Sequence, residues 1–333
     1  MSNKQHYESP FASSVSFAST LSDVYSHNFN NPITIMNPKN ALKNSIKSIV
    51  VVGATVFTLN GVAQDQTKTS YKTERVTDTI YMLSGVGGFT GGNVGLSVGD
   101  DGVAMIDNGV SSVIDILKSE IAEITDQPID YMINTHIHGD HIGNNHVFGK
   151  DGAKIVSHEN LRESLVNDKK NGGPTSFPVL TFNDRMTIYL NDDAAQIIHF
   201  DHAHTDGDAV VYFKNDNVMH TGDIMFNKVF PFIDSNNGGS LDGVIKALEG
   251  IASITNDETK IIPGHGPLAS REDVLSTIEM LKSAKKAVGE LVAAGKSEEE
   301  ILEANPLKPF ESFNWAFIST ERMTKQVLAA FNK

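Results

Sequence analysis

One stretch limits the choice of fold more than any other: the motif H-x-H-x-D-H at residues 136–141, directly after the apolar run Tyr-Met-Ile at 131–133. A short β-rich run followed by polar and Gly residues predicts a strand that ends in a loop. Strand alternation would send the first two histidines to the same side, and the turn at Gly139 would bring the last two residues of the motif to a second point nearby. Imidazole and carboxylate groups together bind Zn²⁺ or a similar divalent metal. The stretch therefore predicts a metal-binding loop and not a chance cluster of surface histidines.

Length, charge and the lack of cysteine restrict the function further. The chain has 333 residues, enough for one large domain or two modest ones. Its formal net charge is −14 and it has no basic stripe, which argues against a nucleic acid or an anionic membrane as partner. Without cysteine there is no disulfide, thiolate ligand or cysteine nucleophile, so a metal must be held by His, Asp or Glu. We therefore expect a small-molecule substrate.

Residues 36–63 have the composition of an export signal. A cationic start at 43–47, an apolar core at 49–59 and small residues before Gln64 are typical of a secretory signal, although a buried strand or an uncleaved anchor has the same composition. Residues 1–35 are Ser/Asn-rich and patternless, whereas Met36 would begin a signal peptide of normal length. We therefore predict a disordered or spurious extension at 1–35, a signal peptide at 36–63, and a periplasmic or secreted mature protein with no stable membrane insertion.

Further along, strands alternate with helices, and many strands end in a His- or Asp-bearing loop. Predicted strands or apolar strand-like runs lie at 79–83, 94–98, 102–107, 131–134, 154–156, 186–190, 196–200, 209–213, 218–220 and 260–262. Predicted helices lie at 113–124, after His158, from Ser240 through Ile251, from Ser270 to Gly295, from Ser297 to Pro306, and at 321–331. Because sites of layered α/β folds form at strand ends, we expect these loops to converge.

A Gly-rich segment at 84–93 separates the first two of these strands and holds one aromatic residue, Phe89. So many glycines predict a hairpin tip. The sequence leaves open whether this tip is a flap over the site or a plain loop.

The motifs in their order resemble a known family. His136-x-His138-x-Asp140-His141 is followed by His204-Thr205-x-Gly207-Asp208, by Gly222-Asp223 and by Gly264-His265-Gly266. This series resembles the metallo-beta-lactamase superfamily over about residues 72–268. The resemblance implies an α/β fold, a four-layered αββα sandwich with two metals in a cleft at one edge of the β layers. We expect the catalytic domain at 72–268 and a helical extension at 269–333 that packs on it.

The resemblance also implies the ligands. One zinc would be held by His136, His138 and His204, the other by Asp140, His141 and His265, and Asp223 would bridge them. Three neutral imidazoles leave an open position on the first metal, and two carboxylates offset the charge of two dications. A bound zinc lowers the pKa of water enough to give hydroxide near neutral pH. Asp140, which could steer that hydroxide, and Asp223 are the expected catalytic carboxylates; iron or manganese also suits such ligands.

Other polar residues near the motifs are expected to support the site. Asp107 resembles a strand-end Asp of the family that hydrogen-bonds to a ligand, and Thr205 and Asp208 would brace their loop. We expect no ligation from five further histidines: His158, which would start a helix, and His146, His199, His202 and His220.

The substrate is less constrained. Metallo-beta-lactamases carry Cys or Ser where Asp223 stands, whereas an Asp resembles the glyoxalase II, lactonase and phosphodiesterase branches. The Lys that binds the drug carboxylate in the Cys subclass is replaced by Phe226, although Lys228 is close enough in sequence to substitute. The apolar segment 225–233 would form either a wall of the substrate site or ordinary core.

These observations predict an exported binuclear zinc hydrolase in which a metal-bridging hydroxide cleaves a small lactam, lactone or ester. Three alternatives stay open: a low-efficiency β-lactamase, a thioester hydrolase of the glyoxalase II type, and a metal-binding accessory protein without activity. The oligomeric state cannot be read from these residues.

Overall fold

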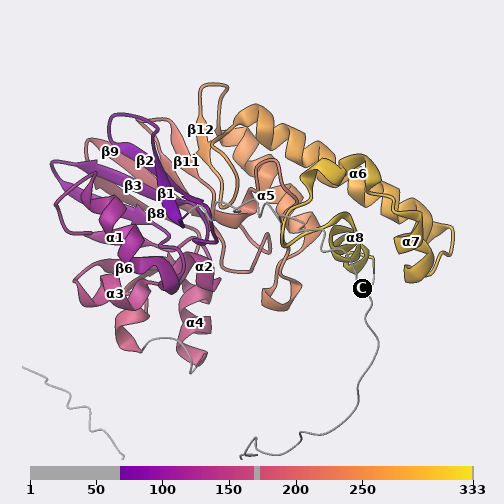
Figure 1. The fold of residues 1–333 in the computed structure, drawn as a ribbon, viewed down its shortest axis with the longest axis horizontal. Helices are drawn as coiled ribbons and strands as arrows, with labels where there is room; N and C mark the ends of the chain where they lie inside the picture. Colours follow the sequence, from indigo (N-terminus) through magenta and orange to yellow (C-terminus); the bar gives the residue numbers. More distant parts are fainter. Residues whose placement is uncertain (1–67, 169–172, 332–333) are drawn as a thin grey trace, which may run out of the picture. The chain divides into compact units, whose positions relative to one another are not determined.

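The computed structural model describes residues 68–168 and 173–331, so the predictions for 1–63 lie outside the described residues. Two β-sheets face each other, with helices on both outer faces (Figure 1). The first sheet has the order β1 (Ser70–Arg75), β2 (Ile80–Val86), β3 (Val94–Gly99), β4 (Gly102–Ile106), β5 (Tyr131–Ile133), β6 (Lys154–His158) and β7 (Leu180–Phe182). Its strands are antiparallel from β1 to β4 and parallel from β4 to β7.

The second sheet has the order β13 (Ala269–Ser270), β12 (Lys260–Ile262), β11 (Val218–His220), β10 (Ala209–Phe213), β9 (Asp193–His199) and β8 (Arg185–Leu190). Only β11 and β12 are parallel. Because β10 runs against β11, the start of β10 lies at the same edge as the end of β11. Loops before β10 and after β11 and β12 therefore meet.

Three apolar clusters define the layers. Residues of both sheets, such as Ile106, Ile133 and Val211, form the cluster between them. The outer face of the first sheet packs against α1 (Ile114–Ala122) and α3 (Asn145–Lys150). The outer face of the second packs against α5 (Leu241–Ile254) and α6 (Arg271–Ala293). This arrangement is the αββα sandwich that the resemblance implied.

The helices begin where their caps predict. Ser240 caps α5, and Ser270 and Ser297 form capping boxes at α6 and α7 (Glu298–Ala304). Gly295, with φ of 74°, follows the end of α6 as a left-handed stop. The 3₁₀ segment η5 (Lys308–Phe313) then leads to α8 (Thr320–Ala329), and α6, α7 and α8 share the apolar cluster of α5.

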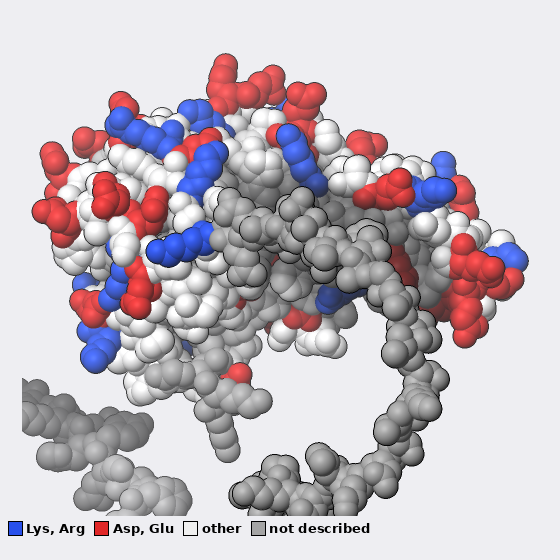
Figure 2. All heavy atoms as spheres, viewed as in Figure 1, with Lys and Arg blue, Asp and Glu red and all other residues white. Residues whose placement is uncertain are grey.

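Acidic side chains outnumber basic ones on the face that Figure 2 shows, and they gather at the end where α7 carries Glu298, Glu299 and Glu300. The basic side chains visible there lie singly or in small groups among them. Within the described residues, no helix combines the length and apolar character needed to cross a membrane.

Tyr71 ties the Gly-rich segment to the first sheet through a buried hydrogen bond. Its buried hydroxyl donates a hydrogen bond to the carbonyl of Thr90, 3.2 Å away, and burial raises the pKa of Tyr71 from 10.0 to about 12. Because the folded-state pKa is raised, the phenol's contribution to stability is complete below pH 10 and is lost as pH rises towards 12.

We therefore expect Tyr71→Phe to cost about 1 kcal/mol near neutral pH through the lost hydrogen bond. Above pH 10 this difference should vanish and then reverse, because only the wild type must ionise a buried phenol; each pKa unit is worth about 1.4 kcal/mol. Urea unfolding over this pH range measures the effect. Tyr189→Phe, at a side chain that is 80% exposed, is the control, and an equal pH profile for both variants would contradict the assignment.

Candidate metal centre

Residues 136–138, the first three of the motif, lie in the loop that follows β5, and the short helix α2 (Gly139–Ile142) comes next. His138, with φ of −68° and ψ of 142°, precedes α2 in extended conformation. The rings of His136 and His138 lie 4.9 Å apart at 90°. Strand alternation is thus the wrong reason for their convergence, because β5 ends at Ile133 and both histidines lie beyond it. The turn at Gly139 does bring Asp140 and His141 to the same place.

The other candidate ligands lie in loops that connect or follow strands of the second sheet. His204 lies in the loop between β9 and β10, Asp223 in the 3₁₀ turn η3 (Gly222–Ile224) after β11, and His265 after β12. The antiparallel and parallel pairings described above place these three loops at one edge, opposite the end of β5.

One group of donors consists of His136, His138, His204 and Asp223, whose ligating atoms all lie within 4.8 Å of one another. His138 Nδ1 is 2.9 Å from His204 Nε2. Asp223 Oδ2 is 3.7 Å from His136 Nε2 and 3.5 Å from His204 Nε2. Three imidazoles and one carboxylate oxygen therefore surround a common point.

A second group consists of Asp140, His141 and His265. Asp140 Oδ2 is 3.3 Å from His265 Nε2 and 3.7 Å from His141 Nε2. The other oxygen of Asp223, Oδ1, is 3.1 Å from His141 Nε2 and 3.5 Å from His265 Nε2. The two oxygens of Asp223 thus face different groups, as a bridging carboxylate requires.

Several of the atoms in these groups that could ligate a metal have no hydrogen-bond partner. Among the described residues, His136 Nε2, His141 Nε2 and Asp223 Oδ1 are buried polar atoms without one. Such atoms are rare in folded proteins because each costs desolvation energy. His136 Nε2 and His141 Nε2 both face Asp223, at 3.7 Å from Oδ2 and 3.1 Å from Oδ1, and imidazole and carboxylate groups suit zinc. The residues therefore fit a pair of divalent cations.

The opposite nitrogen of each of four imidazoles is held by a neighbour, which fixes the ring and its tautomer. The pairs are His136 Nδ1 with Thr135 Oγ1 at 3.0 Å, His138 Nε2 with Asp234 Oδ2 at 2.8 Å, His141 Nδ1 with Asp107 Oδ2 at 2.7 Å, and His204 Nδ1 with the Phe232 carbonyl at 2.7 Å.

Asp107 is one of the carboxylates that support the candidate ligands. Besides His141 it accepts bonds from the backbone N–H and the hydroxyl of Thr135, at 2.8 and 2.7 Å. Its φ of 57° is unusual for a residue with a side chain, which is typical of functional sites. Asp107 also lies near enough to His136 and His141 to count as a donor, but its oxygens are occupied. It therefore supports His141, as the resemblance implied.

Burial and the charges of neighbouring groups together shift the pKa values of the carboxylates and imidazoles in this site. Burial alone would raise the pKa of Asp223, but the nearby His141, His265 and His136 outweigh it and hold that pKa well below its ordinary value. Burial alone would lower the pKa of His265, yet Asp223 and Asp140 raise it to about 9. For His204, burial wins and lowers the pKa to about 4. The centre thus holds an ionised carboxylate and at least one neutral imidazole ready to bind a cation.

Two glycines make room for the ligands. A Cβ on Gly92 would lie 2.2 Å from His141 Cε1, and a Cβ on Gly264 would lie 2.0 Å from Asp223 Oδ1. Neither of these candidate ligands could keep its position beside a larger residue. The Gly-rich segment and the Gly-His-Gly turn therefore serve packing against the centre as well as chain reversal.

The supporting residues lie largely where the sequence indicated. Asp208 accepts bonds from the backbone N–H of His204 and Thr205, at 2.6 and 2.9 Å, and from the Thr205 hydroxyl, so it braces the loop. Burial raises the pKa of Asp208 to about 7. His220 is buried and bonds to the Asn93 carbonyl and the Gly222 N–H.

The remaining histidines stay away from the donors. His158 caps α4 (Glu159–Asn167) and stacks on His199 with ring centres 3.7 Å apart. His202 bonds to the Gly238 carbonyl, and His146 borders a separate cavity.

Aromatic residues line a cavity next to the candidate metal ligands, which we call the aromatic cavity. A cavity of about 390 Å³ is bounded by Asp140, Asp223 and His265 on one side and by Phe226 and Phe232 on another. Phe226 stacks on His265 with ring centres 5.1 Å apart. The segment 225–233 is thus part wall and part core, since Met225, Phe230 and Ile233 belong to the buried cluster. Lys228 is exposed and is not among the residues that border this cavity.

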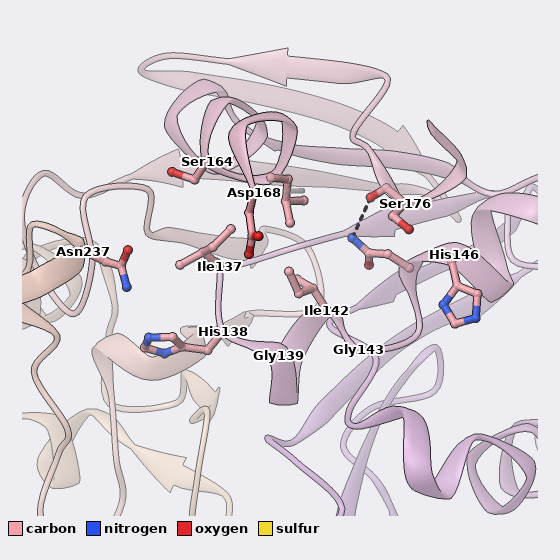
Figure 3. Close-up of a pocket in the computed structure, with 12 residues that line it drawn as sticks. Ile137, His138, Gly139, Ile142, Gly143, His146, Ser164, Asp168, Ser176 and Asn237 are labelled. Carbon is pink, nitrogen blue, oxygen red and sulfur yellow. Dashed lines mark hydrogen bonds between the residues drawn. The ribbon is translucent and has the colours of Figure 1, made fainter. Parts of the chain in front are cut away.

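A second cavity, of about 480 Å³, adjoins the first through His138 and Gly139 (Figure 3). Asn237 and His146 stand on opposite sides of it, and Ile137, Ile142 and Asp168 lie between them. His138 therefore lies between the two cavities.

Two residues near the site escaped sequence reasoning. Asp234, which holds His138, stands in an Asp-Ser-Asn-Asn run that signals only a turn, and its side chain does cap that turn through the N–H groups of Asn236 and Asn237. Arg322 borders the aromatic cavity from α8, far along the chain and outside any motif.

Comparison with known proteins agrees with this geometry. The sequence profile of the metallo-beta-lactamase superfamily matches residues 87–291. No curated protein matches the chain significantly. Similar solved structures include a metallo-beta-lactamase from Pontibacter korlensis (17% identity, 64% of this chain, 99% of that chain, TM-score 0.54), DIM-1 metallo-beta-lactamase (14%, 65%, 100%, 0.56) and metallo-beta-lactamase IND-7 (20%, 64%, 98%, 0.54).

At these identities the solved structures show a shared fold and nothing finer. The profile match, by contrast, spans more than half of the sequence and contains all seven candidate ligands. The chain belongs to the metallo-beta-lactamase superfamily.

Proposed function

We propose that this protein is an exported binuclear zinc hydrolase that cleaves a small carbonyl substrate of the lactam, lactone or ester type. The observation that carries the proposal is the position of Asp223, whose two oxygens face two separate donor groups. Membership of the superfamily supports a metal-dependent hydrolase. Export rests on the signal-like composition of residues 36–63.

The candidate ligands would bind the cations, and one of them could also accept a proton. His136, His138 and His204 would hold one cation, Asp140, His141 and His265 the other, and Asp223 both. When bound, the cations supply Lewis acidity and lower the pKa of a coordinated water. Asp140 borders the open cavity, as His138, Asp223 and His265 also do. Burial alone would raise the pKa of Asp140, but the charge of His141 and the hydrogen bond to His265 outweigh burial and lower it. Its ionised carboxylate can therefore accept a proton at the cavity floor.

The cavity favours a compact substrate with an apolar part. Phe226 and Phe232 exclude water beside the donors, and the aromatic walls offer no row of basic groups for a nucleic-acid backbone. The second candidate is a low-efficiency β-lactamase, because the solved structures with this fold carry that name. Asp223, which stands where metallo-beta-lactamases carry Cys or Ser, and Phe226, which replaces the substrate-binding lysine of the Cys subclass, disfavour efficient lactam hydrolysis.

One experiment separates the candidates. Mature protein of measured zinc content is assayed against nitrocefin, a chromogenic lactone, a thioester and a phosphodiester, before and after chelation. We expect close to two zinc ions per chain, turnover of the lactone or an ester-like compound, and loss of that turnover with chelator. Turnover of nitrocefin alone would favour the β-lactamase, and of the thioester alone the glyoxalase II type. Full zinc content without any turnover would favour the accessory role.

A further inference from the structure

The roof of the aromatic cavity is built by a segment outside the family match. The match ends at residue 291, whereas Trp315, Phe317, Ile318 and Arg322 border the cavity. They lie between η5 and the first turn of α8. This segment therefore gives the cavity features that the shared fold does not set.

Hydrogen bonds hold the roof at a fixed distance from the metal centre. Trp315 Nε1 donates to the carbonyl of Phe230 at 2.9 Å, and the N–H of Phe230 donates to the carbonyl of Phe313 at 2.8 Å. From α8, Gln326 Oε1 accepts from the N–H of Ile233 at 2.7 Å. Since the segment 230–233 also carries the wall residue Phe232, roof and wall form one unit.

An apolar surface runs from a candidate ligand across the roof. The Trp315 ring lies 5.5 Å from that of His265 and 5.0 Å from that of Phe317, and Phe317 contacts Phe89 of the Gly-rich segment at 5.2 Å. Phe89 and Phe317 are 49% and 46% exposed. Such a surface suits the apolar body of a ligand.

One positive charge stands at the edge of this surface. Among the residues that border the cavity, Arg322 is the single Lys or Arg. Its guanidinium lies 5.3 Å from the centre of the Phe232 ring and donates from NH1 to the Phe317 carbonyl at 2.8 Å, which fixes its orientation. Within the described part of the chain, no carboxylate forms an ion pair with it. A guanidinium has five N–H donors in a planar fork, so donors are left for a ligand.

We infer that Arg322 binds a carboxylate of the substrate and selects anionic substrates with an apolar body over neutral ones. The aromatic roof takes the apolar body, and Arg322 takes the charge at its rim. This inference rests on the proposed hydrolase function for its reaction, whereas the binding step can be measured without turnover.

Trp315 provides that measurement, because it is the only tryptophan of the chain and borders the cavity. The zinc-loaded protein is titrated with 4-phenylbutyrate and with its neutral amide, 4-phenylbutanamide, and Trp fluorescence gives each Kd. We expect the wild type to prefer the acid. Arg322→Gln should weaken binding of the acid about tenfold and leave the amide unchanged, and Arg322→Lys, which keeps charge but loses the fork, should lie between.

Lys325→Gln is the matched control. It removes one positive charge from the next turn of α8, but Lys325 pairs with Glu321 at 2.6 Å and borders a different cavity. Its binding of the acid should equal that of the wild type. A wild type without preference for the acid, or an Arg322→Gln variant that binds the acid as the wild type does, would overturn the inference.

Turnover adds a second readout with mono(4-nitrophenyl) glutarate and the neutral 4-nitrophenyl pentanoate. Arg322→Gln should raise KM for the glutarate about tenfold without changing kcat/KM for the pentanoate. If the pentanoate is cleaved but the glutarate is insensitive to Arg322, the inference fails and the hydrolase proposal stands. If neither ester is cleaved, the hydrolase proposal loses its ester substrates and the fluorescence titration alone decides the role of Arg322.

Discussion

Asparagine in place of Asp223 is expected to leave the protein with no more than one zinc ion per chain and to lower kcat/KM more than about 100-fold, since even residues that only support a metal ligand cost 10–100-fold. Asp223 faces both donor groups, with one oxygen towards His204 and the other towards His141. Asparagine offers one neutral oxygen and therefore serves at most one group. Elemental analysis after gel filtration gives the metal content, and the best substrate of the panel gives kcat/KM.

The control for this variant is Asp78→Asn, the same chemical change at a side chain that is 97% exposed and pairs with Arg75. Circular dichroism should show that both variants fold. A folded Asp223→Asn variant with two zinc ions and wild-type kcat/KM would contradict the bridging role and with it the proposed function.

The sequence contained most of the centre because ligands of this kind stand in short motifs after strands. Strand pairing in the second sheet brings the loops of His204, Asp223 and His265 together, which a list of strand ends anticipates. His136, from the first sheet, lies in one donor group with His204 and Asp223. Asp107 was accessible for the same reason, since it follows β4 beside β5. Asp234 and Arg322 were not, because each acts through a contact between distant parts of the chain that no local pattern marks.

The fold, like the site, was predictable from the sequence only in part. Long periodic elements such as α5 and α6 and the apolar strands of the inner cluster followed from their patterns. The sheet edges did not: β1, with the mixed sequence SYKTER, and β7, with three residues, owe their strand state to a single neighbour. Edge strands of this kind are decided by pairing and not by their own composition.

Stripping the metals is expected to destabilise the protein by about 4 kcal/mol for each site that is otherwise occupied at about 1,000 times its Kd. Without cations the centre must balance Asp140 and Asp223 with protons, and it does so partly on His265, whose pKa rises to about 9. Because that folded-state pKa lies above the ordinary 6.5, the proton's contribution to stability is complete below pH 6.5 and is lost as pH rises through about 9.

The metal-free protein should therefore lose about 3 kcal/mol of stability between pH 6.5 and about 9, at about 1.4 kcal/mol per pKa unit. The metal-loaded protein should not, because a cation that displaces the His265 proton binds more tightly as pH rises. Urea unfolding with and without chelator across this range should show the two stability curves moving apart. The metal-free His265→Gln variant cannot bind this proton, so its curve should be flatter; a metal-free wild type as flat as this variant would exclude His265 as the group that stands in for the metal.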